Sequence, residues 1–190
     1  MKRICVYCGS SSGSRTEYLE AAAYLGRCLA KRGVGIVYGG AQVGLMGTVA
    51  SSALNHGGEV IGVIPELFAE KVKHNELSKL YVVPTMHDRK KKMYDLSDGF
   101  MALPGGIGTI EEFFEILAWA QLGCHKKPCG ILNVLGYFDG ILEFVKHSVH
   151  QQFLKTEHRE MIMVDKDPDA LLKQFEKYKA PTVPKWIDMN

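Results

Sequence analysis

The sequence predicts an α/β fold in which helices cover both faces of a doubly wound parallel sheet. Short apolar runs of strand length alternate with amphipathic stretches of helix length along the whole chain. Two of the apolar runs also lead into glycine-rich turns that open a helix, which is typical of the carboxyl ends of parallel strands. We therefore expect a single domain over residues 1–180, with ligands at the carboxyl ends of its strands, and an extended tail over residues 181–190.

The expected elements follow from the hydrophobic pattern. Short apolar runs predict strands at residues 4–7, 35–38, 59–64, 80–83, 100–103, 128–134 and 161–164. Spacing at three and four residues predicts helices at residues 16–31, from about Gly44 onward, and at 86–96, 109–122, 138–153 and 168–178. Gly33 should end the first helix, and Ser14 or Thr16 should cap its start. Residues 66–79 are expected to form a polar connection.

The composition excludes several classes of protein. The chain has 190 residues, 46% of them hydrophobic, and its 23 Lys and Arg residues against 21 Asp and Glu residues leave a net charge of +2. This is enough apolar content for a full core, and the charge is too balanced for a nucleic-acid partner. No apolar run approaches the roughly 18 residues of a membrane span, and the N-terminal run is too short for a signal peptide. We expect a cytoplasmic protein without a membrane partner.

The cysteines do not predict a disulfide framework or a metal site. Five cysteines at irregular spacing suit reduced thiols. Cys5 and Cys8 lie three residues apart on an expected strand, so their side chains should face opposite sides of the sheet rather than form a redox pair. Cys124, His125 and Cys129 lack a second matched pair of zinc ligands.

The most informative stretch is the turn between the expected strand at 100–103 and the next helix. It reads Pro-Gly-Gly-Ile-Gly-Thr over residues 104–109. Gly105, Gly106 and Gly108 permit close approach of a ligand to the main chain, and the free N–H groups of a helix start, with the Thr109 hydroxyl, can bind a phosphate. Alternatively, Thr109 and Glu112 form a capping box, but such a cap requires none of the glycines. The spacing does not match a dinucleotide fingerprint or a P-loop.

Three other stretches should reach the same crevice. A second glycine-rich turn, with Gly40 and Gly44, follows the strand at 35–38, and the loop at 8–13, with Ser10, follows the first strand. For the loop at 8–13, the residues alone slightly favour a simple strand-to-helix connection over a ligand site. Arg89 and Lys90 begin the basic helix at 86–96 where a strand would deliver them to the crevice, whereas the lysines after them fit a solvated face.

Taken together, these stretches resemble the LOG (Lonely Guy) family of cytokinin riboside 5′-monophosphate phosphoribohydrolases, long labelled lysine decarboxylases. The similarity covers nearly the whole chain and is most specific in the Arg-Lys pair and the last glycine turn. The matching motifs are CVYCGSSSG at 5–13, VYGG at 37–40, GLMG at 44–47, VIP at 63–65, MHxRK at 86–90, PGGxGTxxE at 104–112 and WAQLG at 119–123.

The resemblance implies a Rossmann-like homodimer that needs no metal or cofactor. It implies cleavage of the N-glycosidic bond of AMP or N6-substituted AMP, giving free base and ribose 5-phosphate. Arg89 and Glu112 match the catalytic pair, while Gly105, Gly106, Gly108 and Thr109 match the phosphate-binding turn. Lys90, Gly40, Gly44 and Ser10 are further expected substrate contacts.

Two positions depart from the family pattern. Members place a ligand-contacting glutamate before the Arg-Lys helix; Glu70 and Lys71 lie there, so Glu70 makes this contact or the contact is lost. Ile107 stands where members usually have Tyr or Phe.

Chemistry independently favours an enzyme. Cleavage at ribose C1′ builds positive charge on the sugar, which the Glu112 carboxylate can stabilise while activating water. Arg89 offers a bidentate cation for the phosphate or for orienting ribose and base. The competing hypothesis is a non-catalytic carrier of a nucleotide or pterin cofactor, which requires no carboxylate near a glycosidic carbon. A decarboxylase is not favoured, because no lysine has a recognisable pyridoxal phosphate setting.

The helix at 109–122 also predicts an interface between subunits. Ile116, Trp119 and Ala120 lie outside the apolar stripe that faces the core. A helix that is apolar on more than one side needs a second partner. We expect this helix to contribute to a homodimer.

Overall fold

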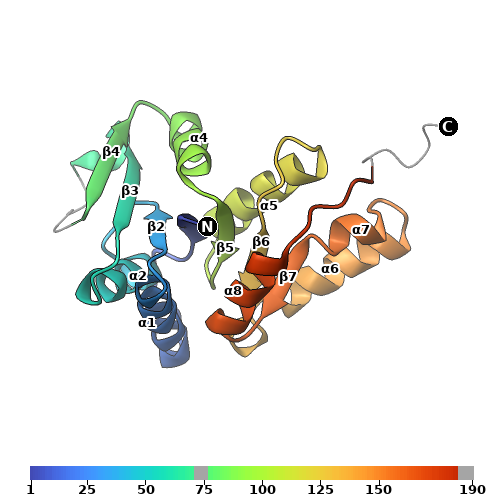
Figure 1. Ribbon diagram of the computed structural model, residues 1–190, viewed down its shortest axis with the longest axis horizontal. Coiled ribbons are helices and arrows are strands. Elements are labelled where there is room, and N and C mark those ends of the chain that lie inside the picture. The colour runs from blue at the N-terminus through green and yellow to red at the C-terminus, as the bar shows by residue number, and fades with distance from the viewer. Residues whose placement is uncertain (71–76, 184–190) are drawn as a thin grey trace.

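The computed structural model describes residues 1–70 and 77–183, which contain one seven-stranded sheet with every neighbouring pair parallel. Figure 1 shows the sheet with its helices. Its strands are β1 (Arg3–Tyr7), β2 (Gly35–Tyr38), β3 (Val60–Pro65), β4 (Lys79–Val83), β5 (Gly99–Ala102), β6 (Cys129–Leu132) and β7 (Ile162–Asp165). The helices are α1 (Thr16–Lys31), α2 (Gly44–Asn55), α3 (Glu66–Ala69), α4 (Met86–Leu96), α5 (Ile107–Gln121), η1 (Val134–Gly136), α6 (Asp139–His150), α7 (Thr156–Arg159) and α8 (Pro168–Lys177).

The strand order is β4-β3-β2-β1-β5-β6-β7. The chain therefore builds outward from β1 to one edge, returns to the other side of β1 with β5, and builds outward again. In such a sheet the loops after the two strands at the reversal diverge to opposite faces, which leaves a crevice at their carboxyl ends. Here that crevice lies between the loops that follow β1 and β5.

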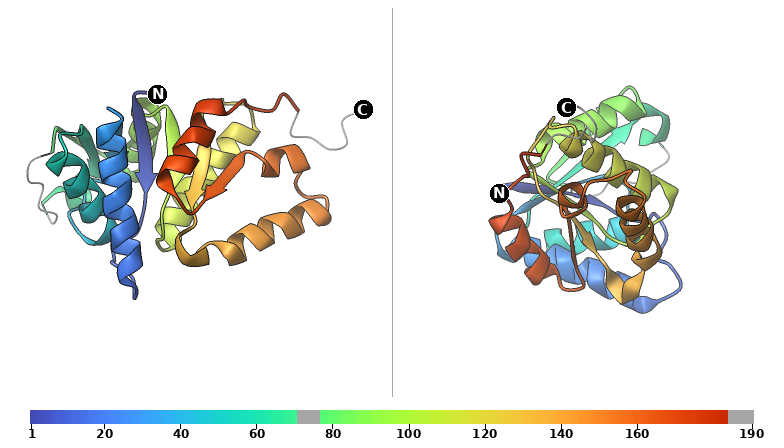
Figure 2. Two further views of the ribbon diagram at one scale, coloured as in Figure 1. Left: turned by 60° about the horizontal axis from the view of Figure 1, so that its bottom comes forward. Right: turned by 90° about the vertical axis from the view of Figure 1, so that its right-hand side faces the viewer.

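Side chains alternate along the strands between two hydrophobic cores. On one face, Ile4, Val6 and Cys8 pack with buried residues of α1, α2 and α8. On the other face, Cys5 and Tyr7 pack with buried residues of α4, α5 and α6. Figures 1 and 2 show the helices on the two sides of the sheet. The predicted doubly wound α/β fold is confirmed.

The structure bears out the prediction for the first cysteine pair. Cys5 and Cys8 are buried on opposite faces of the sheet, and all five cysteines are free thiols. Two residues of a strand that are separated by an odd number of positions point to opposite sides. Among the described residues, no helix is both long and apolar enough to cross a membrane.

Several local predictions are wrong. The sequence predicted neither α3, which begins the expected polar connection at 66–79, nor α7. Both helices have four residues, too few to show a hydrophobic period. Neither Ser14 nor Thr16 caps α1, whose N-cap is Arg15 without a side-chain bond. The tail at 181–190 remains a prediction, since residues 184–190 lie outside the described part.

Candidate active site

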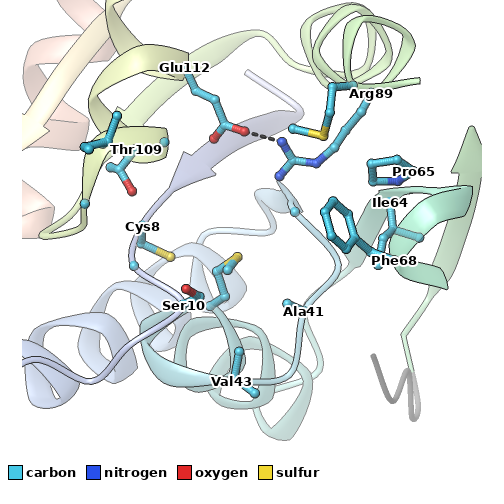
Figure 3. A pocket seen from close by; sticks show the side chains of 17 residues that line it. Cys8, Ser10, Ala41, Val43, Ile64, Pro65, Phe68, Arg89, Thr109 and Glu112 are labelled. Carbon is cyan, nitrogen blue, oxygen red and sulfur yellow. Dashed lines mark hydrogen bonds and ion pairs between the residues drawn. The ribbon is translucent and has the colours of Figure 1, made fainter. Parts of the chain in front are cut away.

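Three loops meet at the crevice between β1 and β5. The loop after β1 is joined to the turn after β5 by a hydrogen bond from Gly9 N to Pro104 O (2.9 Å). The same loop is joined to the start of α2 by a bond from Leu45 N to Gly9 O (3.1 Å). A cavity of about 600 Å³ opens where they meet (Figure 3). This volume is in the range of small-ligand sites.

The glycine turn after β5 presents unpaired donors to this cavity. Gly106 is the N-cap of α5, and Thr109 lies in its first turn. Within residues 1–70 and 77–183, the backbone N–H groups of residues 106–109 have no hydrogen-bond acceptor. Gly106, Gly108 and Thr109 line the cavity. These donors at the positive end of a fifteen-residue helix form a site for an anion.

The capping-box alternative for this turn is wrong. A capping box requires Thr109 to be the N-cap, but the helix begins two residues earlier, at Ile107, and its start has no side-chain cap. The Thr109 side chain is buried beside Gly105 and reaches the cavity.

Arg89 and Glu112 form an ion pair in the wall of the cavity, from Arg89 Nη1 to Glu112 Oε1 (Figure 3). Arg89 lies in the first turns of α4, and Glu112 lies on α5 one helical turn beyond Thr109. Only 10% of the arginine side chain and 12% of the glutamate side chain are exposed. Arg89 Nε also donates to Val63 O (3.2 Å) in β3. The guanidinium is therefore held by two elements besides its own.

Gly39 makes room for this guanidinium. A Cβ atom at Gly39 would collide with Arg89 Nη2. Any larger residue at this position would displace the arginine from the cavity wall. Glycine is thus required at the end of β2 by close packing rather than by its backbone torsion.

The opposite wall of the cavity is apolar. It is formed by Ile64 and Pro65 at the end of β3, by Phe68 of α3, and by Met86 at the start of α4. Figure 3 shows Ile64, Pro65 and Phe68 facing the polar side formed by Thr109 and Glu112. A ligand with an anionic end and a flat or apolar end matches this division.

Cys8 lies on the cavity floor and is not a reactive thiol. Burial, with a smaller effect of the nearby Glu112 carboxylate, raises its pKa above the ordinary value. Because a thiol must ionise to act as a nucleophile, Cys8 serves as a neutral packing group.

Comparisons with known proteins agree with this geometry. A family described as "Possible lysine decarboxylase" matches residues 46–175. A rice protein, "Probable cytokinin riboside 5′-monophosphate phosphoribohydrolase LOGL9" from Oryza sativa subsp. japonica, is 48% identical over 178 residues, 93% of this chain and 78% of its own. "Cytokinin riboside 5′-monophosphate phosphoribohydrolase" from Rhodococcoides fascians is 46% identical over 173 residues, 90% of this chain and 87% of its own. This chain belongs to the cytokinin riboside 5′-monophosphate phosphoribohydrolase (LOG) family.

Solved structures show the same fold at much lower identity. The molybdenum cofactor carrier protein from Chlamydomonas reinhardtii superposes with a TM-score of 0.72 at 21% identity, over 93% of this chain and 99% of that one. The molybdenum cofactor binding protein from Rippkaea orientalis has a TM-score of 0.70 at 19% identity, over 93% and 97%. These similarities confirm the Rossmann-like architecture expected for a LOG family member.

The structure brings six of the predicted site residues of this LOG family member to the cavity. They are Ser10, Arg89, Gly106, Gly108, Thr109 and Glu112. Gly105 lies directly behind them, where a Cβ atom would collide with the Thr109 hydroxyl. The roles that the resemblance assigns to these residues remain predictions.

Four other predicted residues do not line the cavity. Lys90 turns toward the outer side of α5 and binds Glu111 (2.7 Å) and Glu115 (3.0 Å), because consecutive helix positions point about 100° apart. Glu70 is exposed at the end of α3, and Lys71 lies outside the described residues. Gly40 and Gly44 adopt positive φ angles of 81° and 55°.

Gly44 does not line the cavity, but it supports a loop that does. A Cβ atom there would collide with the main chain of Ser10. Glycine at this position therefore allows the start of α2 to pack on the loop after β1, which carries Ser10 to the cavity. The sequence indicated that a glycine is needed at position 44, but not that it packs against the loop after β1.

Sequence reasoning missed the apolar wall and Cys8. Phe68 lies in the segment expected to be a polar connection, and Met86 was not singled out as a ligand contact. Among the described residues, no three His, Cys, Asp or Glu side chains gather as a possible metal site.

Proposed function

We propose that this chain hydrolyses the N-glycosidic bond of nucleoside 5′-monophosphates, AMP or its N6-substituted forms, to free base and ribose 5-phosphate. The observation that supports this most is the buried Arg89–Glu112 pair one helical turn from a row of unpaired N–H groups. A helical turn rises about 5.4 Å, a spacing that suits a ribose with its phosphate at one end and its C1′ at the other.

Glu112 is the residue that acts at the broken bond. As the C1′–N bond breaks, its electron pair goes to the base and positive charge develops on the ribose, where the carboxylate stabilises it. The oxygen of a water molecule then bonds to C1′ while Glu112 accepts one of its protons. The departing base takes up a proton. Arg89 orients the carboxylate and offers free N–H donors to the ribose or phosphate.

The phosphate occupies the start of α5 in this proposal. The N–H groups of residues 106–109 and the Thr109 hydroxyl supply donors, and the helix dipole adds a favourable field. The base lies toward the wall formed by Ile64, Phe68 and Met86. The names of the relatives support a cytokinin nucleotide as the substrate, since both are described as acting on cytokinin riboside 5′-monophosphates.

The alternative is a carrier that holds a nucleotide or pterin cofactor. The carrier proteins among the structural neighbours share the fold, but at about 20% identity this similarity carries no function. Burying the Glu112 carboxylate beside an anion site costs desolvation energy, and a protein that only stores its ligand gains nothing from this carboxylate. The carboxylate and the much closer LOG relatives therefore favour the enzyme.

The test is to incubate the purified protein with AMP, N6-prenylated AMP and the two matching nucleosides, and to measure free base by chromatography. We expect kcat/KM for the nucleotides to exceed that for the nucleosides by about 10²–10⁴, since at least two charge-assisted hydrogen bonds to phosphate are lost. Part of this loss should appear in kcat, because remote binding energy is used at the reacting bond. Comparable cleavage of adenosine and AMP would contradict the assigned phosphate site, and tight binding without cleavage would favour the carrier.

A further inference from the structure

The three backbone carbonyls of residues 104–106, at the start of the glycine turn, each accept a hydrogen bond. Pro104 O accepts from Gly9 N at 2.9 Å, and Gly106 O accepts from Ile110 N at 3.2 Å in the first bond of α5. Between them, Gly105 O accepts a hydrogen bond from the hydroxyl of Tyr137 at 2.7 Å. This middle bond is the only one of the three that a side chain makes. We propose that Tyr137 is a positioning residue that aims the turn at the phosphate of the substrate.

The geometry of the peptide bond explains how Tyr137 acts at a distance. In a trans peptide the carbonyl of one residue and the N–H of the next point in opposite directions. The hydroxyl that holds Gly105 O therefore also orients Gly106 N–H, which has no acceptor among the described residues and belongs to a residue of the cavity lining. Because Gly105 and Gly106 lack side chains, little else resists rotation of this peptide.

Tyr137 is itself held by a shaped loop between β6 and α6. Asn133 lies at the start of the loop, accepts from Phe138 N (2.8 Å) and donates to Asp139 Oδ1 (2.7 Å). Leu135 and Gly136 adopt positive φ angles of 53° and 71°, which turn the chain back toward α5. Phe138 is buried in the core next to Tyr137. Because the loop between β6 and α6 is itself held by these contacts, its Tyr137 can hold the glycine turn in place.

The ring of Tyr137 has a separate role from its hydroxyl. It packs edge-on against Tyr18 of α1, with ring centroids 5.7 Å apart. Replacing Tyr137 by Phe keeps this contact and removes only the bond to Gly105 O. The turn would then be free to rotate its carbonyl toward the phosphate, which repels the anion and withdraws one N–H donor.

This inference rests on the proposed function, and its test uses competition kinetics with AMP as the substrate. In Tyr137→Phe we expect kcat/KM for AMP to fall about tenfold and the Ki of ribose 5-phosphate to rise about tenfold. The Ki of adenosine, which has no phosphate, should stay unchanged. A general loosening of the fold would weaken both inhibitors alike, so the ratio of the two Ki values isolates the positioning role.

Tyr24→Phe is the matched control. This substitution also deletes a tyrosine hydroxyl that donates a hydrogen bond, to Asp169 Oδ2 at 3.0 Å. Tyr24, however, does not line the cavity. We expect wild-type constants in this variant. Equal weakening of ribose 5-phosphate and adenosine by Tyr137→Phe, or no change in either, would overturn the inference while leaving the hydrolase intact. A wild-type protein that neither cleaves AMP nor binds ribose 5-phosphate would overturn the proposed function and this inference with it.

Discussion

At the scale of single residues, the carboxylate of Glu112 carries the proposed chemistry. Replacing it by Gln keeps the size of the side chain and an oxygen that can still accept from Arg89. We predict that kcat for AMP falls about 10²-fold or more, as for loss of one electrostatic stabiliser in an active site. The melting temperature should change only modestly, since Glu112 does not cap α5.

Glu111→Gln is the control for this substitution. Glu111 is the adjacent residue on α5, is exposed, and binds Lys90 on the outside of the cavity. We predict near-normal turnover, because Glu111 lies outside the cavity. Stability should also stay near normal, because surface ion pairs contribute little to folding. An early-melting Glu112→Gln protein with unchanged activity per folded molecule would refute the catalytic role.

At the scale of secondary-structure elements, α5 and α6 leave a groove open to solvent. Its apolar walls include Phe114 and Leu117 of α5, Phe144 of α6, and Phe153 just beyond α6. Phe144 is 66% exposed and Phe153 is 86% exposed. Buried residues of α5 and α6 belong to the same core cluster as those of α4, so the three helices cover one face of the sheet. Exposed aromatic rings gathered in one groove are typical of a surface that a partner covers.

The homodimer through α5 remains a prediction, but with other residues than the sequence indicated. Ile116 and Ala120 are buried within the subunit, and Trp119 packs on Tyr94. The helix period placed them outside the core stripe, but α4 and β6 cover that side as well. The groove residues are instead the ones available to a second copy.

Light scattering at micromolar concentration tests the homodimer. We predict twice the 21.1 kDa mass of the chain for the wild type and a shift toward monomer for Phe144→Ser combined with Phe153→Ser. Leu67→Ser, which removes a 68% exposed side chain on α3, should remain dimeric. A wild-type monomer would refute the interface.

At the scale of the whole molecule, Asp98 links the start of β1 to the start of β5 at the centre of the sheet. Its carboxylate accepts from Lys2 N (2.6 Å) and Arg3 N (3.0 Å), and its own N–H donates to Arg3 O (2.8 Å). Burial alone disfavours the charged carboxylate, but these backbone donors outweigh it and hold the pKa of Asp98 below its ordinary value. The charged form therefore stabilises the fold.

This arrangement predicts a dependence of stability on pH. Because the pKa is lower in the folded state, the stabilisation is present above the unfolded pKa of about 4 and is lost as pH falls through the folded pKa. We predict that Asp98→Asn lowers the free energy of unfolding by about 1 kcal/mol at pH 7 after allowance for solvent screening, and that the difference from wild type shrinks toward pH 2. Chemical denaturation at both pH values measures this.

Glu20→Gln provides the reference for the pH series, since Glu20 is an exposed glutamate of α1 without a hydrogen bond in the described part of the chain. Its stability should follow the wild type at every pH. A constant deficit of Asp98→Asn across the whole range would show that the carboxylate charge is not responsible.

The amino-acid sequence by itself determined the architecture and the general place of the site. Alternating strand and helix periods leave few options besides a parallel sheet covered on both faces, and the glycine turns indicated at which strand ends a ligand site is expected. The predicted catalytic pair was also accessible, because Arg89 and Glu112 each lie near a recognisable start of a helix. These features depend on local patterns, which a linear sequence records directly.

Only the tertiary structure decided which residues face the cavity. Lys90 follows Arg89 directly, yet it turns away to Glu111 and Glu115, because the direction of a side chain depends on the rotation of its helix against the sheet. Phe68 and Tyr137 come from segments without a hydrophobic period, and they reach the cavity wall and the glycine turn through contacts between residues far apart in the chain. Such contacts arise from packing in three dimensions, which no local pattern of residues encodes.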